Sequence, residues 1–338
     1  MGKTDKIYLE LVKDILDNGV EKNTRAGEVI SVFGRQVRFN LKEGLPMLTT
    51  KKMFSKGCII ELLWFLKGDT NIKYLLDNNV HIWDDDAYRF YIEKVNKHNE
   101  LCDFFIQNFS KKVPVVYHHI EPCSKEDFIE KCKNGEKIFL NDQPYFFDVS
   151  PYNYVYGDLG PVYGKQWRGF GNLKVDQLKN IIDTLKTNPD DRRMLCLAYN
   201  PCELYKMALP PCHVMFQFYT KPLPNGKREL SCMWTQRSVD TMLGLPFNIL
   251  SYAILTHMVA QVCDMEVGEL IGSLGDCHIY KNQLEGVEKQ LQRDPTKFNN
   301  PKLKLNSEVK DIFKFTYEDF SIENYRSEDT IKFPLSVG

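Results

Sequence analysis

The sequence predicts an α+β fold in which a substantial sheet is covered by helices. Two amphipathic patterns predict helices near residues 8–16 and 175–189. Three runs rich in β-branched and aromatic residues predict strands at 194–200, 213–220 and 228–236, and a Pro-Asn-Gly turn joins the last two as a hairpin. Helical and strand patterns of this kind are typical of the α+β class.

Composition and charge describe an ordinary globular chain. The 338 residues include 43% hydrophobic and 26% charged side chains, and 44 basic residues balance 45 acidic ones. These values exclude collagen, a disordered tail protein and a membrane bundle. A nucleic-acid binder usually carries a basic excess, so the charge balance argues against nucleic acid as a partner. We expect a single domain over residues 1–338, with an insertion at about 87–155.

The N-terminal elements follow from local patterns. The apolar face of the first helix ends at Asn18 and Gly19. Residues 29–41 predict a strand or two. Residues 58–68 are apolar nearly all round, so they predict a buried core helix. A carboxylate inside such a helix, at Glu61, needs a partner or a function.

The character of the sequence changes between Asp86 and about Val155. This stretch mixes charges, aromatic residues and short helical fragments without a long period. Its many aromatic side chains would be costly to expose. We therefore interpret it as an insertion that packs on the main domain.

The C-terminal half contains the most apolar helical pattern. Residues 246–262 start with Pro246 at a plausible first helical position. No run reaches the ~18 uninterrupted apolar residues of a membrane span, so this segment predicts a buried helix. Residues 268–280 and a final helix around 282–292 complete the predicted core.

Ten cysteines are scattered along the chain and form neither a CxxC pair nor a Cys/His metal ladder. The N-terminus lacks the apolar region and cleavage site of a secretory signal. Scattered thiols without a signal are typical of a reducing cytosol. We therefore expect a cytoplasmic protein and no metal site.

Reactive side chains stand at the ends of two predicted strands. Cys212 enters one strand behind two prolines. A lone cysteine is more often a packed thiol than a nucleophile, although local arginines could depress its pKa toward a reactive thiolate. His278 and Tyr280 share one face of the other strand by alternation, and a histidine there is usually a satisfied core group.

Two polar strings fit an anionic ligand. Arg192 and Arg193 stand side by side before a strand, either as surface charges of a turn or as two guanidinium forks for a phosphate. Arg237, Ser238 and Asp240 supply a cation, a hydroxyl and an acceptor just ahead of a buried helix. Such a polar string is hard to explain by core packing alone.

Six segments together resemble signature blocks of the thymidylate synthase family, in the family's order. They read LTTKK, IIELLWFLKGDTNI, GDLGPVYGKQWR, ALPPCHVMFQFY, QRSVDTMLGLPFNI and GDCHIYKNQ. The resemblance covers residues 7–86 and 156–337 and leaves 87–155 as an insertion. It implies a large mixed sheet covered by helices and a sheet-mediated homodimer. It also implies reductive methylation of deoxyuridine monophosphate (dUMP) to dTMP by 5,10-methylenetetrahydrofolate.

The resemblance assigns catalytic roles to five residues. Cys212 matches the nucleophile that adds at uracil C6 and makes C5 reactive, with Arg237 stabilising the thiolate and holding phosphate. Glu61 matches a residue that moves protons through ordered water, because burial should raise its pKa. Tyr163 matches the residue near the C5 proton, and Asp240 completes the catalytic set.

The resemblance also outlines a dUMP site. Arg25 maps to a phosphate ligand, whereas Arg192 and Arg193 map to a pair that reaches across the dimer into the partner's site. Asn248 matches the base reader, because a carboxamide can donate to uracil O4 and accept from N3–H. The predicted set is Arg25, Arg192, Arg193, His213, Gln236, Arg237, Ser238, Val239, Asp240 and Asn248, with His278 and Tyr280 on the deoxyribose hydroxyl.

For the folate, the resemblance implies a separate set of contacts. Trp83 and Asp240 map to the pterin site, and the C-terminal tail closes over the folate. The predicted folate set is Lys51, Phe54, Trp83, Asp240, Leu243, Gly244, Phe247 and Val337.

The sequence departs from the family's pattern in a few places. The arginine loop around Arg25 is one residue shorter, Thr235 replaces a common tyrosine, and the tail is one residue longer. These changes concern tail closure and therefore the fate of the one-carbon unit. Two alternatives stay open: a dUMP hydroxymethylase, in which water replaces hydride, and a non-catalytic nucleotide- or RNA-binding regulator.

Overall fold

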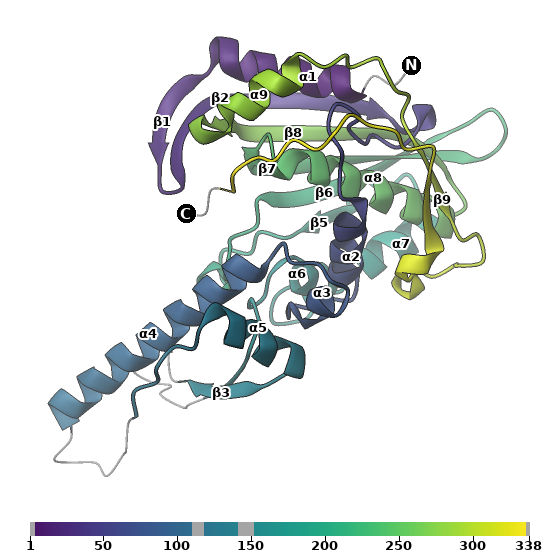
Figure 1. Ribbon diagram of the computed structural model, residues 1–338. Coiled ribbons are helices and arrows are strands. Elements are labelled where there is room, and N and C mark those ends of the chain that lie inside the picture. Colours follow the sequence, from purple (N-terminus) through teal and green to yellow (C-terminus); the bar gives the residue numbers. More distant parts are fainter. Residues whose placement is uncertain (1–3, 110–117, 141–151, 336–338) are drawn as a thin grey trace. The chain divides into compact units, whose positions relative to one another are not determined.

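The chain forms two compact units, seen in a computed structural model that describes residues 4–109, 118–140 and 152–335 (Figure 1). The first unit comprises Met1–Gly68, Gln166–Asn200 and Pro211–Gly338, and the second comprises Asp69–Lys165 and Pro201–Pro210. The predicted insertion at 87–155 falls within the second unit.

A six-stranded mixed sheet is the framework of the first unit, in the order β1-β2-β8-β7-β6-β5 (Figure 1). All neighbouring strands are antiparallel except β7 and β8, which run parallel. A parallel pair needs a crossover connection, and helix α8 supplies it. The strands are β1 (Val20–Thr24), β2 (Gly27–Asn40), β5 (Leu195–Leu197), β6 (His213–Pro222), β7 (Arg228–Asp240) and β8 (Glu266–Tyr280).

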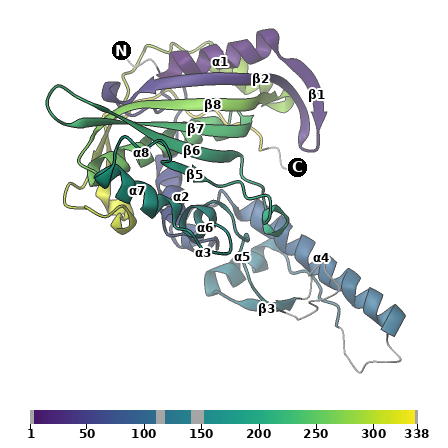
Figure 2. The same cartoon turned by 180° about the vertical axis from the view of Figure 1, so that it is seen from behind.

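Helix α8 (Gly244–Val262) covers one face of this sheet. Its Tyr252 stacks on Trp234 of β7 and contacts Phe216 of β6, each with ring centroids 5.6 Å apart. On β8, a Cβ at Gly272 would come within 2.5 Å of the Trp234 ring, so glycine there makes room for the indole. The other elements of this unit are α1 (Thr4–Asn18), α2 (Ser55–Leu66), α7 (Gln177–Thr187, beside β5 in Figure 2), α9 (Leu284–Leu291), and the antiparallel pair β9 (Lys302–Leu305) and β10 (Phe320–Glu323).

The opposite face of the sheet is only partly covered within the described residues. In β7, alternate residues from Leu230 to Gln236 are buried toward α8, whereas the residues between them are half-buried. Large apolar side chains stand on this sheet in solvent: Tyr219 is 66% exposed and Phe33 is 78% exposed. A sheet face of this kind suits an interface with another protein.

Most predicted elements of the first unit are confirmed within a few residues. The first helix ends at Asn18, and the Pro-Asn-Gly hairpin joins β6 to β7. β1 was not predicted, because its five residues are polar or exposed throughout and show no alternation. Pro246 is the third residue of α8 and not the first; it still lies in the first turn, where a missing N–H costs nothing.

The second unit corrects one expectation. Where the sequence predicted only short helical fragments, α4 (Asp84–Phe109) runs for 26 residues. Its buried stripe includes Ala87, Tyr91, Val95, His98 and Cys102, which follow helical spacing. The polar His98 interrupts the apolar period, so the sequence pattern concealed the helix.

An aromatic core holds this unit together. The Tyr91 ring lies 5.1 Å from Phe128 and 5.2 Å from Tyr156, measured between ring centroids. The remaining elements of this unit are α3 (Lys73–Asp77), α5 (Lys125–Asn134) and the antiparallel strands β3 (Lys137–Leu140) and β4 (Tyr152–Val155), while α6 (Tyr163–Gly169) runs from this unit into the first.

Within the described part of the chain, α8 alone is long and apolar enough to cross a membrane by length and composition. Of its most apolar stretch, 72% is buried inside the structure. Core helices of folded proteins pass the same test, and the packing of Tyr252 on the sheet accounts for this one.

Candidate active site

The polar strings singled out in the sequence meet at one end of the sheet. Because β7 and β8 are parallel, Asp240 pairs with His278 near the carboxyl ends of both strands. β6 is antiparallel to β7, so its first residue, His213, pairs with Gln236. Cys212, directly before β6, therefore lies at the same end as the polar ends of β7 and β8.

Cys212 is held beside Arg237. The Arg237 amide donates to the Cys212 carbonyl at 2.8 Å, and the guanidinium Nε donates to the Pro211 carbonyl at 2.9 Å. The thiol is half-buried and the guanidinium is exposed. A fixed positive charge next to a partly accessible thiol favours the thiolate.

His213 faces inward, away from solvent. Its Nδ1 is hydrogen-bonded to the Tyr252 hydroxyl at 2.7 Å, and its ring lies near Phe65. Burial lowers the pKa of His213 to about 3, so the imidazole is neutral at physiological pH. Any effect of His213 on a phosphate would therefore not be that of a cation.

The neighbouring strand residues are also fixed within the sheet. Gln236 accepts a hydrogen bond from the Trp234 indole at 3.2 Å and donates to the Ser238 carbonyl at 3.0 Å. Val239 is fully buried. These contacts hold the end of β7 in the conformation that presents Arg237 and Asp240.

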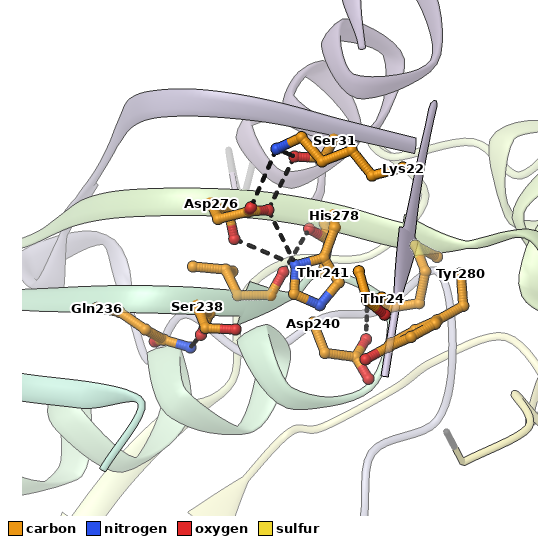
Figure 3. Close-up of polar contacts among 12 residues, drawn as sticks. Lys22, Thr24, Ser31, Gln236, Ser238, Asp240, Thr241, Asp276, His278 and Tyr280 are labelled. Carbon is orange, nitrogen blue, oxygen red and sulfur yellow. Dashed lines mark hydrogen bonds and ion pairs between the residues drawn. The ribbon is translucent and has the colours of Figure 1, made fainter. Parts of the chain in front are cut away.

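His278 is oriented by a cluster of charged and polar groups (Figure 3). Its Nδ1 lies 3.3 Å from the Asp276 carboxylate, which also accepts from Ser31 at 2.8 Å and from Lys22 at 3.3 Å. Burial alone would raise the pKa of Asp276, but the hydrogen bonds from Ser31 and Lys22 outweigh it and the pKa is lowered. An ionised Asp276 accepts a hydrogen bond from Nδ1–H of His278, which leaves Nε2 of the ring to contact a ligand.

Asp240 and Tyr280 lie beside this cluster (Figure 3). Burial raises the pKa of Asp240, although the amides of Leu243 and Met242 donate to it at 3.0 and 3.1 Å. Burial also raises the pKa of Tyr280, and the negative charges of Asp240 and Cys212 raise it further. Tyr280 therefore remains a protonated hydrogen-bond donor close to both groups.

Asn248 lies in the second turn of α8, a few residues after the turn at Met242 and Leu243, whose amides donate to Asp240. Its side chain is half-buried, and its Oδ1 would lie 3.8 Å from a Cβ built on Gly244. The carboxamide makes no side-chain hydrogen bond to any described residue. Leu243, Gly244 and Phe247 are half-buried around the same turn, so this turn can contact a ligand.

Lys51 reaches the same turn from residues 48–53. Its ammonium donates to the Met242 carbonyl and lies 4.6 Å from the centre of the Phe333 ring. Burial lowers the pKa of Lys51 to about 8, while the charges of Asp240 and Asp5 act in the opposite direction. Phe54, two residues before the apolar core of α2, is 52% exposed.

Glu61 lies in α2, which packs against α8 through a Cys58 thiol that donates to the Phe247 carbonyl at 3.5 Å. Glu61 is half-buried, whereas its neighbours from Gly57 to Leu66 are buried. Glu61 is therefore the most accessible side chain in this stretch of α2. The raised pKa of Glu61 stays a prediction.

Trp83 and Tyr163 belong to the second unit, where both side chains are buried and their ring centroids lie 6.3 Å apart. They contact each other edge to face, as aromatic pairs prefer. The predicted folate residue Val337 lies outside the described residues.

Three predicted phosphate ligands are exposed arginines. Arg25 lies in the turn between β1 and β2, at the same sheet end as Cys212. Arg192 and Arg193 lie before β5, and Arg193 pairs with Asp191 at 2.6 Å. Leu195 pairs with Gln217, five residues beyond Cys212. At ~3.3 Å per strand residue, Arg193 lies roughly 20 Å from Cys212 of its own chain.

Lys22 and Ser31 were missed by reasoning from the sequence. Ser31 lies on β2, which was predicted only as a strand, and Lys22 lies on β1, which was not predicted. Both reach Asp276 only through the pairing of β1 with β2 and of β2 with β8. No local motif marks such a contact. Among residues 4–109, 118–140 and 152–335, no group of three or more His, Cys, Asp or Glu side chains could hold a metal ion.

The lowered pKa of Lys51 predicts a pH-dependent stability. Burial opposes the charged ammonium, so the folded state is penalised below pH 8, and the penalty is relieved as the pH rises from 8 to 10.5. Lys51→Met removes the burial penalty but also the hydrogen bond and ring contact of the ammonium. The net effect should be a rise in the free energy of unfolding of about 1–2 kcal/mol at pH 7 and a smaller rise at pH 9.5. Urea unfolding under reducing conditions measures both values. The exposed Lys179→Met serves as the control, and a pH-independent loss of stability in Lys51→Met would contradict the burial argument.

Comparison with known proteins identifies the family. The sequence model of the thymidylate synthase family matches residues 6–337, nearly the whole chain. This confirms the resemblance drawn from the six sequence blocks. Members of this family are one-carbon transferases that bind dUMP and use methylenetetrahydrofolate as cosubstrate. The mixed sheet flanked by helices fits the same assignment. The chain therefore belongs to the thymidylate synthase family.

Proposed function

We propose that the protein is a thymidylate synthase, which converts dUMP to dTMP with 5,10-methylenetetrahydrofolate. The observation that carries the proposal is the convergence of Cys212, Arg237, Asp240 and His278 at one end of the sheet. A nucleophile, a cation, a carboxyl group and an oriented imidazole are thereby placed on adjacent strands. Such groups can activate the base of a nucleotide and hold its sugar and phosphate.

The chemistry begins at Cys212. Uracil C5 is a weak nucleophile until a group adds at C6, and addition of the Cys212 thiolate there makes C5 an enolate carbon. C5 then forms a bond to the one-carbon unit and loses its proton, and the bond between that carbon and the folate nitrogen breaks. Hydride from the folate reduces the carbon to a methyl group. Departure of the thiolate from C6 restores the ring double bond and frees the enzyme. Arg237 favours the thiolate at the start and at the end of this sequence.

Residues around the α8 turn read the base and hold the sugar. Asn248 offers both a donor for uracil O4 and an acceptor for N3–H. His278, oriented through Nδ1 by Asp276, presents Nε2 to the deoxyribose hydroxyl, and Tyr280 adds a donor. Glu61 is the proposed group for proton transfer through water, and Tyr163 for removal of the C5 proton.

The folate-side residues fit a reduced pteridine with an anionic tail. Lys51 is a buried cation, Asp240 a half-buried carboxyl group whose pKa burial raises, and a Cβ at Gly244 would only touch Asp240 and Asn248, at 3.8 Å from each. When bound, the folate supplies both the one-carbon unit and the hydride that reduces it, and it becomes dihydrofolate. In this chain, Lys51 attracts the folate's carboxylates and Asp240 accepts from the pteridine.

A homodimer completes the proposed site. Arg192 and Arg193 lie roughly 20 Å from Cys212 along their own strand pair, too far to hold the same phosphate. The partly covered sheet face, with Phe33 and Tyr219 exposed, offers a surface for a second copy. A dimer through that face would let the arginines of one chain serve the site of the other.

Dihydrofolate formation separates this proposal from its alternatives. When dUMP and methylenetetrahydrofolate are mixed with the protein, a thymidylate synthase releases dihydrofolate. Its formation is followed as a rise in near-ultraviolet absorbance. A hydroxymethylase consumes the folate without oxidising it, because water takes the place of hydride. A regulator that only binds nucleotide or RNA does neither. Absence of dihydrofolate with a correctly folded protein would contradict the proposal.

Replacement of the nucleophile should abolish turnover and spare binding. Cys212→Ser puts a hydroxyl, far less nucleophilic at neutral pH, in the place of the thiolate. Turnover should fall by at least about a thousandfold, while the Kd for dUMP stays within a few-fold of wild type. The exposed Cys202→Ser is the control and should keep full activity. Near-normal turnover in Cys212→Ser would remove the assignment of the nucleophile.

Mixing two inactive variants tests whether sites are shared between chains. A heterodimer of Cys212→Ser and Arg193→Ala chains contains one site with both defects and one with neither. Activity should therefore return to at most about half of the wild-type value per heterodimer. Subunit exchange is verified by native mass spectrometry. No recovery after full exchange would mean that Arg193 acts within its own chain.

Base recognition can be tested by exchanging the carboxamide. Asn248→Asp loses the donor to uracil O4, and its oxygens can accept from the amino group of cytosine instead. Loss of such a buried pair costs about 1–3 kcal/mol, so the preference for dUMP over deoxycytidine monophosphate should shift roughly ten- to a hundredfold. The measurement is the ratio of kcat/KM for the two nucleotides. An unchanged ratio would show that Asn248 does not read the base.

A further inference from the structure

Residues 48–53, which carry Lys51, are hydrogen-bonded by three separate parts of the first unit. Asp5 of α1 bonds Thr49 and Thr50, Gln290 and Arg293 bond Thr50 from the α9 side, and the C-terminal segment bonds Leu48, Thr49 and Met53. This convergence is more than the backbone of a short connection requires.

Asp5 makes the densest of these contacts. Its Oδ2 accepts from the amide and the hydroxyl of Thr49, both at 2.8 Å. Its Oδ1 accepts from the amide and the hydroxyl of Thr50 at 2.9 and 2.5 Å. Asp5 is 2% exposed, Thr49 1% and Thr50 0%. A buried carboxylate with four donors fixes the two residues directly before Lys51.

The same helix also fixes the group that Lys51 approaches. The Tyr8 hydroxyl, one turn after Asp5, donates to the Thr241 carbonyl at 2.9 Å. Thr241 follows Asp240 and precedes Met242, whose carbonyl accepts from the Lys51 ammonium. Helix α1 therefore holds both sides of the contact between Lys51 and the turn after β7.

The C-terminal segment rests on the residues that Asp5 holds. The Tyr325 hydroxyl donates to the Leu48 carbonyl at 2.8 Å, and the Glu328 amide donates to the Thr49 carbonyl at 2.8 Å. Arg293 bridges the two segments, because its guanidinium donates to the carbonyls of Thr50 at 2.5 Å and Asp329 at 2.6 Å. A shift of Thr49 or Thr50 would therefore disturb these contacts of the C-terminal segment as well as the position of Lys51.

We propose that Asp5 is a positioning residue for the folate. Through Thr49 and Thr50 it fixes the position of Lys51 and the surface on which the C-terminal segment packs. This inference rests on the proposed function of the same site. Asp5 touches neither the nucleotide residues nor Cys212, so its effect falls on the folate and spares dUMP. The negative charge of Asp5 also supports the Lys51 ammonium, as does that of Asp240, against the cost of burial.

The test replaces the carboxylate by a group of the same shape. Asp5→Asn keeps the volume but turns one acceptor into a donor that faces two donors of Thr49 or Thr50. The Kd for methylenetetrahydrofolate, measured by equilibrium binding in the presence of dUMP, should rise roughly tenfold, while the Kd for dUMP alone stays within about twofold. Asp14→Asn is the matched control, because it makes the same exchange on the same helix at a surface pair with Arg35.

A pH profile adds a readout that general loosening would not produce. Without the charge of Asp5, the pKa of Lys51 should fall further, and folate binding should weaken at a lower pH than in the wild type. An unchanged folate Kd in Asp5→Asn would overturn the proposal. So would an equal loss of dUMP and folate affinity, since that would mark Asp5 as merely structural.

Thr49→Val decides the matter if Asp5→Asn does not fold. It removes one hydroxyl donor at nearly constant volume and leaves the amide bonds to Asp5 in place. The folate Kd should rise about two- to threefold with dUMP binding unchanged, and no change would overturn the proposal. Because these are binding measurements, they stand apart from the assay for dihydrofolate. A wild type that binds folate but produces none would contradict the proposed function and leave the positioning role to be judged on its own.

Discussion

The parallel pairing of β7 with β8 is the constraint on which the rest of the site depends. In a sheet whose other pairs are antiparallel, this one pair brings two carboxyl ends together, so Asp240 lies beside His278. The crossover that the pairing requires is α8, which returns Asn248 to the same end. β6 then needs only an ordinary hairpin to place Cys212 next to Arg237. One choice of strand direction thus assembles residues that are distant in sequence.

Burial sets the electrostatics around this sheet end. His213 and Lys51 lose affinity for protons because they are buried, whereas Asp240 and Tyr280 hold theirs more tightly for the same reason. Asp276 differs, because its donors outweigh burial and keep it ionised. The site therefore combines a neutral imidazole at His213 and a protonated hydroxyl at Tyr280 with the fixed charges of Arg237 and Asp276. Such an arrangement suits a substrate that brings its own negative charge and needs directed hydrogen bonds around an uncharged base.

Sequence patterns predicted much of this fold, and the family blocks supply the site residues, whose roles stay predictions. Helices such as α1 and α8 carry clear periods, and Cys212 lies in a strongly marked block. What escaped prediction has two causes. The local pattern is absent in β1 and is broken by His98 in α4, whereas Lys22 reaches Asp276 only through the register of three neighbouring strands. Register and partner strands are tertiary properties, which one sequence does not display.

In the proposed reaction, the Cys212 thiolate forms a bond to the nucleotide at this sheet end. Intact-protein mass spectrometry and peptide mapping test it directly, with methylenetetrahydrofolate and a dUMP whose C5 hydrogen is replaced by fluorine. Fluorine cannot leave as the C5 proton does, so the reaction should stop with nucleotide and folate joined to the protein. We expect this mass increase to map to the peptide containing Cys212. The absence of an adduct, or an adduct on another cysteine such as Cys202, would contradict it.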